Sequence, residues 1–406
     1  MIIRWFLSVG LLILCGLMVA RGQAPTSMAP LLKSATTPAR NLKVFDALWQ
    51  RVNEDYFDPR FNGADWGRLR EVYRPRAERA ENLEVLTHVL EEMLGELKTS
   101  HLELTRALKR SEISTRIGRK VSRGQEVVLS TGVNFDKVGG RWAVTTVRES
   151  SPAAGAGVRI GWEITHANGE SIESAEIEPR EGEKIRFGFI DEEGKTVELS
   201  LPYQWIAVTP SRESRWIDKE LAYLRFGQFE DDVDRWLAGE LARYHDARAV
   251  ILDLRGNTGG WLHLTEKCLG QFFAGKVAYG AFLKRDHAEM RLFSEGAGAR
   301  AYTGRLLILT DSQTASSAEI FAAAIQETGR GRIIGQPTSG QVLPSLQYKL
   351  PENFQLTMAV MDFLTARGRR LEGRGVSPDR VTPPQSLDDL RRHHDPTLQE
   401  ALATLR

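Results

Sequence analysis

Two stretches decide the fold, Ala249-Val-Ile-Leu-Asp-Leu-Arg-Gly-Asn-Thr-Gly-Gly260 and Leu306-Leu-Ile-Leu-Thr-Asp-Ser-Gln-Thr-Ala-Ser-Ser-Ala-Glu-Ile320. Each begins as a continuous apolar run and passes through a Gly- or Ser-rich loop into a helical stretch. Buried strands that alternate with helices are typical of an α/β layer structure. Functional sites of such folds gather where strands end and loops begin. We therefore expect a site at the loops 256–260 and 311–317.

Upstream of these stretches the spacing of apolar residues along the chain changes twice. Apolar residues at three- and four-residue spacing, Leu42 to Val52 and Leu83 to Leu97, predict amphipathic helices and a helical region over 41–114. From 124 onward β-rich runs take over, and the turn-forming Asp191-Glu-Glu-Gly194 joins two of them. The sequence thus predicts a small β domain over 115–205 and an α/β domain over 206–406.

The first residues have the pattern of a secretory leader. Met1-Ile-Ile-Arg4 is a short basic segment, and the apolar run Trp5 to Ala20 follows it. A short segment with small residues comes next, and the predicted cleavage site is near its Ala24. We predict a signal peptide over 1–24, a flexible tether over 25–40 and an exported protein, periplasmic or extracellular. The alternative is an uncleaved anchor, because the run is near the lower limit of a membrane-spanning helix.

Composition excludes several partners and cofactors. The 406 residues carry 54 Lys plus Arg against 53 Asp plus Glu, so no global field attracts nucleic acid. Removal of the leader leaves one cysteine, Cys268, in an apolar helical context where packing is its expected role, and no intramolecular disulfide can form. The adjacent pair His393-His394 lacks the spacing of a metal site, and no phosphate-binding Gly-rich motif is present, so no cofactor is expected.

Ser316 is the candidate nucleophile. A serine at the start of a helix that follows a buried strand has its hydroxyl held at a fixed point, with backbone N–H groups aimed at one spot. The amide of Ser317, with that of Gly259 or Gly260 from the other loop, would form an oxyanion hole. The alternative is that Thr314, Ser316 or Ser317 only caps the helix.

Four segments resemble successive signatures of the C-terminal processing peptidase and tricorn-core family. They are 252–260, 314–320, Gly335-Gln-Pro-Thr-Ser-Gly340 and Leu371-Glu-Gly-Arg-Gly-Val-Ser-Pro-Asp379. Upstream, Ser151-Pro-Ala-Ala-Gly-Ala-Gly157 resembles part of that family's PDZ domain. The resemblance implies a catalytic α/β domain of the ClpP/crotonase-like kind, a PDZ-like domain and an N-terminal helical region, and it implies a serine peptidase.

The resemblance also implies roles for individual residues. Processing members of the family pair the nucleophile with a Lys 25 residues downstream, where this chain has Gln341, which cannot act as a base. The tricorn-like branch uses a Ser-His-Ser-Glu arrangement, and Ser100, His101 and Glu372 occupy the matching positions. We therefore expect Ser316 as nucleophile, His101 as general base, Ser100 as its orienter and Glu372 behind it. His101 and Glu372 could equally be surface residues.

The PDZ-like segment implies a peptide-binding site. A PDZ domain adds an extended peptide as a strand and receives its terminal carboxylate in a loop of amides. Thr131, Gly132, Val133, Asn134 and Phe135 resemble that loop. Substrates would then be peptides or unfolded proteins.

Three functions remain open at this point. The first is an exported endopeptidase that works by acyl transfer. The second is a peptide- or lipid-binding protein on the same fold without turnover, since Gln341 replaces the family Lys. A PDZ adaptor is the third, and it leaves the last 200 residues unexplained.

Overall fold

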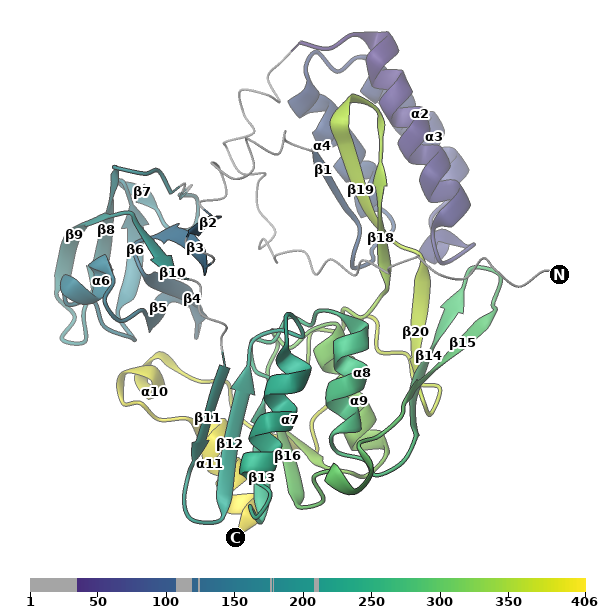
Figure 1. The fold of residues 1–406 in the computed structure, drawn as a ribbon. Coiled ribbons are helices and arrows are strands. Elements are labelled where there is room, and N and C mark those ends of the chain that lie inside the picture. The colour runs from purple at the N-terminus through teal and green to yellow at the C-terminus, as the bar shows by residue number, and fades with distance from the viewer. Residues whose placement is uncertain (1–34, 107–118, 123–124, 176, 178, 208–211) are drawn as a thin grey trace. The chain divides into compact units, whose positions relative to one another are not determined.

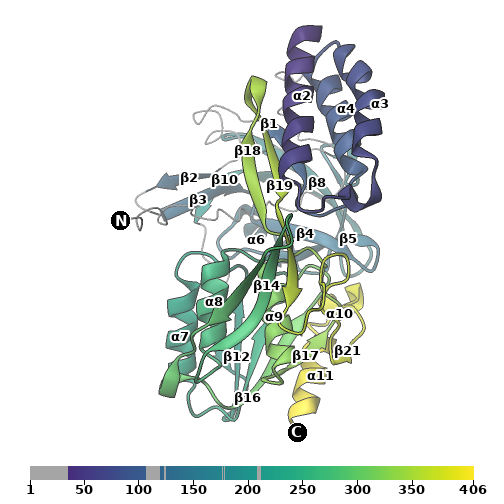
Figure 2. The same ribbon diagram turned by 90° about the vertical axis from the view of Figure 1, so that its right-hand side faces the viewer.

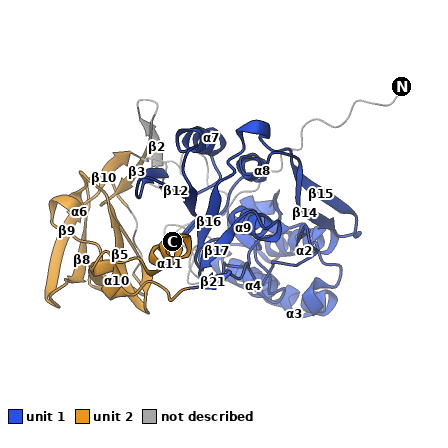
Figure 3. Cartoon of the chain, turned by 90° about the horizontal axis from the view of Figure 1, so that it is seen from below, with its two compact units in different colours: residues 1–20, 31–107, 211–381 blue, residues 21–30, 108–210, 382–406 orange. Residues whose placement is uncertain are grey.

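The chain divides into two compact units (Figure 3). The computed structural model describes residues 35–106, 119–122, 125–175, 177, 179–207 and 212–406. The predicted signal peptide and the first ten residues of the predicted tether lie outside the described residues. Within the described part of the chain, no helix is long and apolar enough to cross a membrane.

The first unit is built on a six-stranded sheet with the order β11-β12-β13-β16-β17-β21. The edge strand β11 is antiparallel to β12, and the other neighbours are parallel. The strands are β11 (Arg212–Trp216), β12 (Leu221–Phe226), β13 (Ala249–Asp253), β16 (Arg305–Thr310), β17 (Arg332–Gly335) and β21 (Arg380–Val381). Every residue of β13 is buried, as its continuous apolar run predicts.

Three helices cover one face of this sheet, α7 (Val233–Arg243), α8 (Leu262–Gly270) and α9 (Ser317–Glu327) (Figure 1). The apolar core lies between these helices and the sheet and includes Phe226, Phe229 and Phe321. Helix α9 is buried along its first nine residues because Ala, Ile and Phe occupy all sides of it. The predicted α/β fold is confirmed.

The helical region belongs to this first unit and ends in a strand. Its helices are α2 (Pro38–Asp55), α3 (Trp66–Glu78) and α4 (Leu83–Gly95). Strand β1 (Glu103–Arg106) then pairs with β19 (Phe354–Ala359), which pairs with β18 (Ser345–Lys349), all antiparallel. Figure 2 shows this small sheet beside the helices. A second sheet, β15 (Glu289–Ser294), β14 (Val277–Lys284) and β20 (Met361–Thr365), completes the unit.

The second unit is β-rich. One sheet has the order β4-β5-β6-β8-β9, with β7 against β6, and the other has the order β10-β3-β2. Its strands are β2 (Arg119–Ser122), β3 (Gln125–Ser130), β4 (Val133–Val138), β5 (Arg141–Val147), β6 (Glu163–Ala167), β7 (Glu170–Ser171), β8 (Lys184–Ile190), β9 (Thr196–Pro202) and β10 (Gln204–Ala207). Its helices are α6 (Pro152–Gly155), α10 (Leu387–Arg391) and α11 (Pro396–Leu405).

The last 25 residues group with the β-rich unit, although the sequence placed them in the α/β domain. The second unit takes 108–210 and 382–406. The contact is specific, because Arg391 donates through Nε to the Gly161 carbonyl at 3.0 Å and lies 3.4 Å from Glu163. Periodicity could not reveal this grouping, because it reports on single elements and not on which core they join.

Candidate active site

The two Gly- and Ser-rich loops lie against each other at the carboxyl ends of the neighbouring strands β13 and β16. The Thr314 hydroxyl donates to the Leu254 carbonyl at 2.9 Å, and the amide of Ala315 donates to the carbonyl of Asn257 at 2.9 Å. The amide of Gly256 donates to Asp311 at 3.0 Å. The predicted juxtaposition of the two loops is therefore present.

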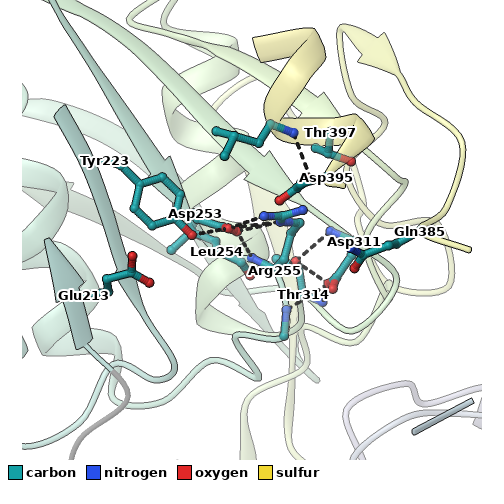
Figure 4. Close-up of polar contacts among 12 residues, drawn as sticks. Glu213, Tyr223, Asp253, Leu254, Arg255, Asp311, Thr314, Gln385, Asp395 and Thr397 are labelled. Atoms are coloured by element: carbon teal, nitrogen blue, oxygen red, sulfur yellow. Dashed lines mark hydrogen bonds and ion pairs between the residues drawn. The ribbon is translucent and has the colours of Figure 1, made fainter. Parts of the chain in front are cut away.

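A buried ion pair fixes the start of the Gly-rich loop (Figure 4). Asp253 is fully buried and accepts the hydroxyl of Tyr223 at 2.7 Å and Nε of Arg255 at 2.9 Å. Burial alone would raise the pKa of Asp253, but the charge and hydrogen bonds of Arg255 outweigh it and lower that pKa. The carboxylate therefore stays ionised and holds Arg255 at the mouth of the loop.

Ser316 occupies the position before the first residue of α9 with an unusual backbone conformation, φ 55° and ψ −124°. A non-glycine residue with positive φ costs about 1–3 kcal/mol and persists only where its surroundings enforce it. Its side chain is 6% exposed. The amide of Ser316 donates to the Glu319 carboxylate at 3.0 Å, which is one half of a capping box.

Gly259 lies directly against the nucleophile segment. A Cβ at Gly259, which has φ +99°, would lie 2.7 Å from Cβ of Ser316 and 2.9 Å from the amide nitrogen of Ser317. The amide of Gly259, however, donates to Oδ1 of Asn257 at 2.9 Å. The Ser317 hydroxyl donates to the Gly260 carbonyl at 2.8 Å and so ties the two loops together. Because the Gly259 amide already donates to Asn257, the geometry favours the amide of Gly260 as the second oxyanion donor.

Ser100, His101 and Glu372 come together although 272 residues separate the first from the last. Oγ of Ser100 lies 2.7 Å from Nδ1 of His101, and the amide of Ser100 donates to Glu372 at 3.1 Å. Burial raises the pKa of Glu372, and hydrogen bonds from the Val342 amide and from the hydroxyl and amide of Ser100 oppose that rise. Burial lowers the pKa of His101 to about 4. A neutral imidazole at physiological pH is the state that a general base requires.

Sequence reasoning missed Glu319, which organises the site. The buried carboxylate accepts from four donors: the hydroxyl of Thr338 at 2.5 Å and the amides of Ser316, Gly340 and Gln341 at 3.0, 2.7 and 2.9 Å. Burial raises its pKa, and these four hydrogen bonds oppose the rise. The spacing Ser-x-x-Glu before an apolar helix was the available signal, since it is the signature of a capping box.

The predicted peptide-binding loop lies in the β-rich unit, between β3 and β4. Its backbone is packed against residues 148–153: the carbonyls of Thr131 and Gly132 accept the amides of Ala153 and Arg148, at 3.0 and 2.8 Å. Val133 to Phe135 begin β4, an edge strand that pairs only with β5 among the described residues. No helix is present over the described residues between β7 and β8.

A cavity of about 680 Å³ lies elsewhere in the first unit. Its lining includes Asp55, Lys284, Arg285, Tyr348 and Met361. None of the predicted catalytic residues lines this cavity.

Two protein-family models match parts of this chain. Residues 220–382 match the model of peptidase family S41, and residues 38–95 match the model of the tricorn protease C1 domain. A tricorn protease homolog of Streptomyces coelicolor is 26% identical over 89% of this chain, which spans 32% of that relative. A carboxyl-terminal-processing protease of Synechocystis is 25% identical over 99% of this chain and 93% of its own length.

Solved structures share the fold. The photosystem II D1 C-terminal processing protease superposes with a TM-score of 0.59 at 19% identity, over 86% of this chain and 94% of its own. The tricorn protease superposes with a TM-score of 0.53 at 18% identity, over 91% of this chain and 36% of its own.

Proposed function

We propose, from the match of residues 220–382 to peptidase family S41, that the chain is a serine peptidase in which Ser316 and His101 hydrolyse peptide bonds through an acyl-enzyme. The observation that carries the proposal is the placement of Ser100, whose amide donates to Glu372 at 3.1 Å and whose Oγ lies 2.7 Å from Nδ1 of His101. In the tautomer that suits a base, Nδ1 of His101 carries the proton and donates it to Oγ of Ser100. The lone pair of His101 then resides on Nε2, where a base can take a proton from the nucleophile.

The chemical steps follow from these groups. Oγ of Ser316 attacks the scissile carbonyl while Nε2 of His101 takes its proton. The amides of Ser317 and Gly260 stabilise the resulting oxyanion. The imidazolium returns the proton to the leaving amine, and a water molecule, activated by the same Nε2, then hydrolyses the acyl-enzyme and releases Ser316. Gln341 takes no part through its side chain, because an amide cannot transfer this proton.

The β-rich unit supplies a place for the substrate in this proposal. Strand β4 can accept an extended peptide along its free edge through main-chain hydrogen bonds. The loop Thr131–Phe135 at the start of this strand supports a role in selecting peptides or unfolded proteins. In the predicted exported setting, the leader 1–24 would direct the chain to the periplasm or the exterior.

The test is hydrolysis of casein by the chain without residues 1–24, together with labelling by a fluorophosphonate. We expect Ser316→Ala and His101→Ala to lose about 10⁴-fold or more in kcat/KM. Two surface variants serve as matched controls, Ser312→Ala in the same loop and His245→Ala, and both should keep full activity. If wild type and Ser316→Ala were equally inert and unlabelled while both bound peptide, the chain would be a binding protein instead.

A further inference from the structure

The turn that carries His101 is held in a strained conformation. Lys98 and His101, three residues apart, both have positive φ, 48° and 53°. Side chains other than glycine adopt this region rarely, and only where the surrounding structure determines it. The Ser100 amide is anchored on Glu372. A second anchor is needed at the beginning of the turn, where the chain leaves α4.

Asn62 is that second anchor. Its Nδ2 donates to the Leu97 carbonyl at 2.8 Å and to the hydroxyl of Tyr56 at 3.1 Å. Asn62 itself has φ 52°, and its own amide donates to Asp58 at 2.9 Å. One side-chain amide therefore joins the loop after α2 to the residue just before the strained turn.

Tyr56 makes this anchor rigid. The residue is fully buried, its ring stacks on Phe61 at 6.1 Å, and Nη1 of Arg285 donates to its carbonyl. Burial raises the pKa of Tyr56 to about 12, and the negative charge of Glu372 is one of the smaller causes. The Tyr56–Asn62 pair thus holds the Leu97 end of the His101 turn, while Glu372 holds the Ser100 amide.

We propose that Asn62, braced by Tyr56, is a positioning residue that sets the orientation of the His101 imidazole toward Ser316. This inference rests on the proposed Ser/His mechanism. Asn62 contacts neither nucleophile nor base and acts through the Leu97–His101 backbone. Loss of its amide would relax the turn, so that the imidazole moves and water reaches it.

The test is Asn62→Gly, because glycine adopts φ 52° without strain and the substitution removes the side chain that carries the amide. Asn353→Gly is the matched control, since Asn353 is an exposed asparagine with φ 62° in the same unit. We expect Asn62→Gly to lower kcat by about tenfold with KM unchanged. The acid limb of its pH–rate profile should move up from about 4 toward the ordinary value for histidine. Asn353→Gly should match wild type in kcat and in the pH–rate profile.

A second readout separates this inference from the proposed function. In full-length chains carrying Ser316→Ala, ¹⁵N-histidine NMR follows the titration of His101 without any turnover. We expect the midpoint to rise in Asn62→Gly and not in Asn353→Gly. A lower melting temperature with an unchanged imidazole titration and pH profile would overturn the positioning role. A shifted titration in a chain that hydrolyses nothing would keep the positioning role and reject the peptidase mechanism.

Discussion

Glu319 and Glu372 hold adjacent residues of one segment: Glu319 accepts the amide of Gln341 at 2.9 Å and Glu372 accepts that of Val342 at 3.0 Å. Glu319 also holds the Ser316 amide, and Glu372 also holds the Ser100 amide. The proposed nucleophile and base, which come from distant parts of the chain, are therefore positioned from the same short stretch of backbone. Both carboxylates act as acceptors of backbone N–H groups, which is what fixes distances in a buried site.

Glu319→Gln should damage both stability and activity. The new amide group turns N–H donors toward a site that already holds four donors, so at least two hydrogen bonds are lost in a buried place. We expect a loss of about 3 kcal/mol in unfolding free energy, measured by urea denaturation, and at least a hundredfold loss in kcat. Glu220→Gln, at an exposed ion pair, is the control and should change neither. Full activity in Glu319→Gln would show that the hydrogen bonds accepted by the Glu319 carboxylate are dispensable for catalysis.

Gln341→Ala should be nearly silent. The structure uses the backbone amide of Gln341, which alanine retains. We expect kcat/KM within about twofold of wild type, because surface and half-buried side chains without a hydrogen-bonded role contribute little. A loss of more than tenfold would mean that the side chain itself contacts substrate or the reacting groups.

Activity should persist well into the acid range. Burial lowers the pKa of His101 to about 4, and the base is active in its neutral form, which predominates above that pKa. kcat/KM for a short peptide should therefore be level down to about pH 5 and fall through about pH 4. Circular dichroism over the same range checks that the fold is intact. A rise in activity with an alkaline midpoint would instead point to an amine as the base.

Gly259→Ala should abolish activity while Gly256→Ala should not. Both glycines have positive φ, 99° and 69°, so both substitutions carry backbone strain of about 1 kcal/mol. Only at Gly259 would the new Cβ lie 2.7 Å from Cβ of Ser316, whereas at Gly256 its nearest neighbour is 3.8 Å away. We expect at least a hundredfold loss of kcat for Gly259→Ala, measured against casein, and under threefold for Gly256→Ala. Equal losses of kcat in the two variants would mean that backbone strain, and not contact with the nucleophile, causes the loss.

Local patterns in the sequence predicted much of the fold. The continuous apolar runs at 249–254 and 306–309 became the buried strands β13 and β16, and the Ser-rich loop became the start of α9. The hairpins β14–β15 and β18–β19 were missed. Strand β14 is buried over four consecutive residues and does not alternate, whereas β18 and most of β19 do alternate, so their pattern was an available signal that was not used. The pairing of β1 with β19 joins residues about 250 apart, and periodicity contains no information on such contacts.

The candidate site could likewise be predicted only in part from local patterns in the sequence. The two loops could be placed together because they follow strands predicted for one parallel sheet. The grouping of Ser100, His101 and Glu372 came from family resemblance alone, since no spacing rule links residue 101 to residue 372. Asn62 gave no signal in the sequence, because its role depends on a left-handed turn after α2 that only the folded chain shows.

The strained backbone conformation of Ser316 has a consequence for stability that can be measured without any substrate. A glycine fits φ 55° and ψ −124° without strain, so Ser316→Gly should fold more stably than Ser316→Ala, and as stably as wild type or more so. The serine at this position therefore carries a cost in stability that glycine would avoid, and its proposed role as nucleophile accounts for that cost.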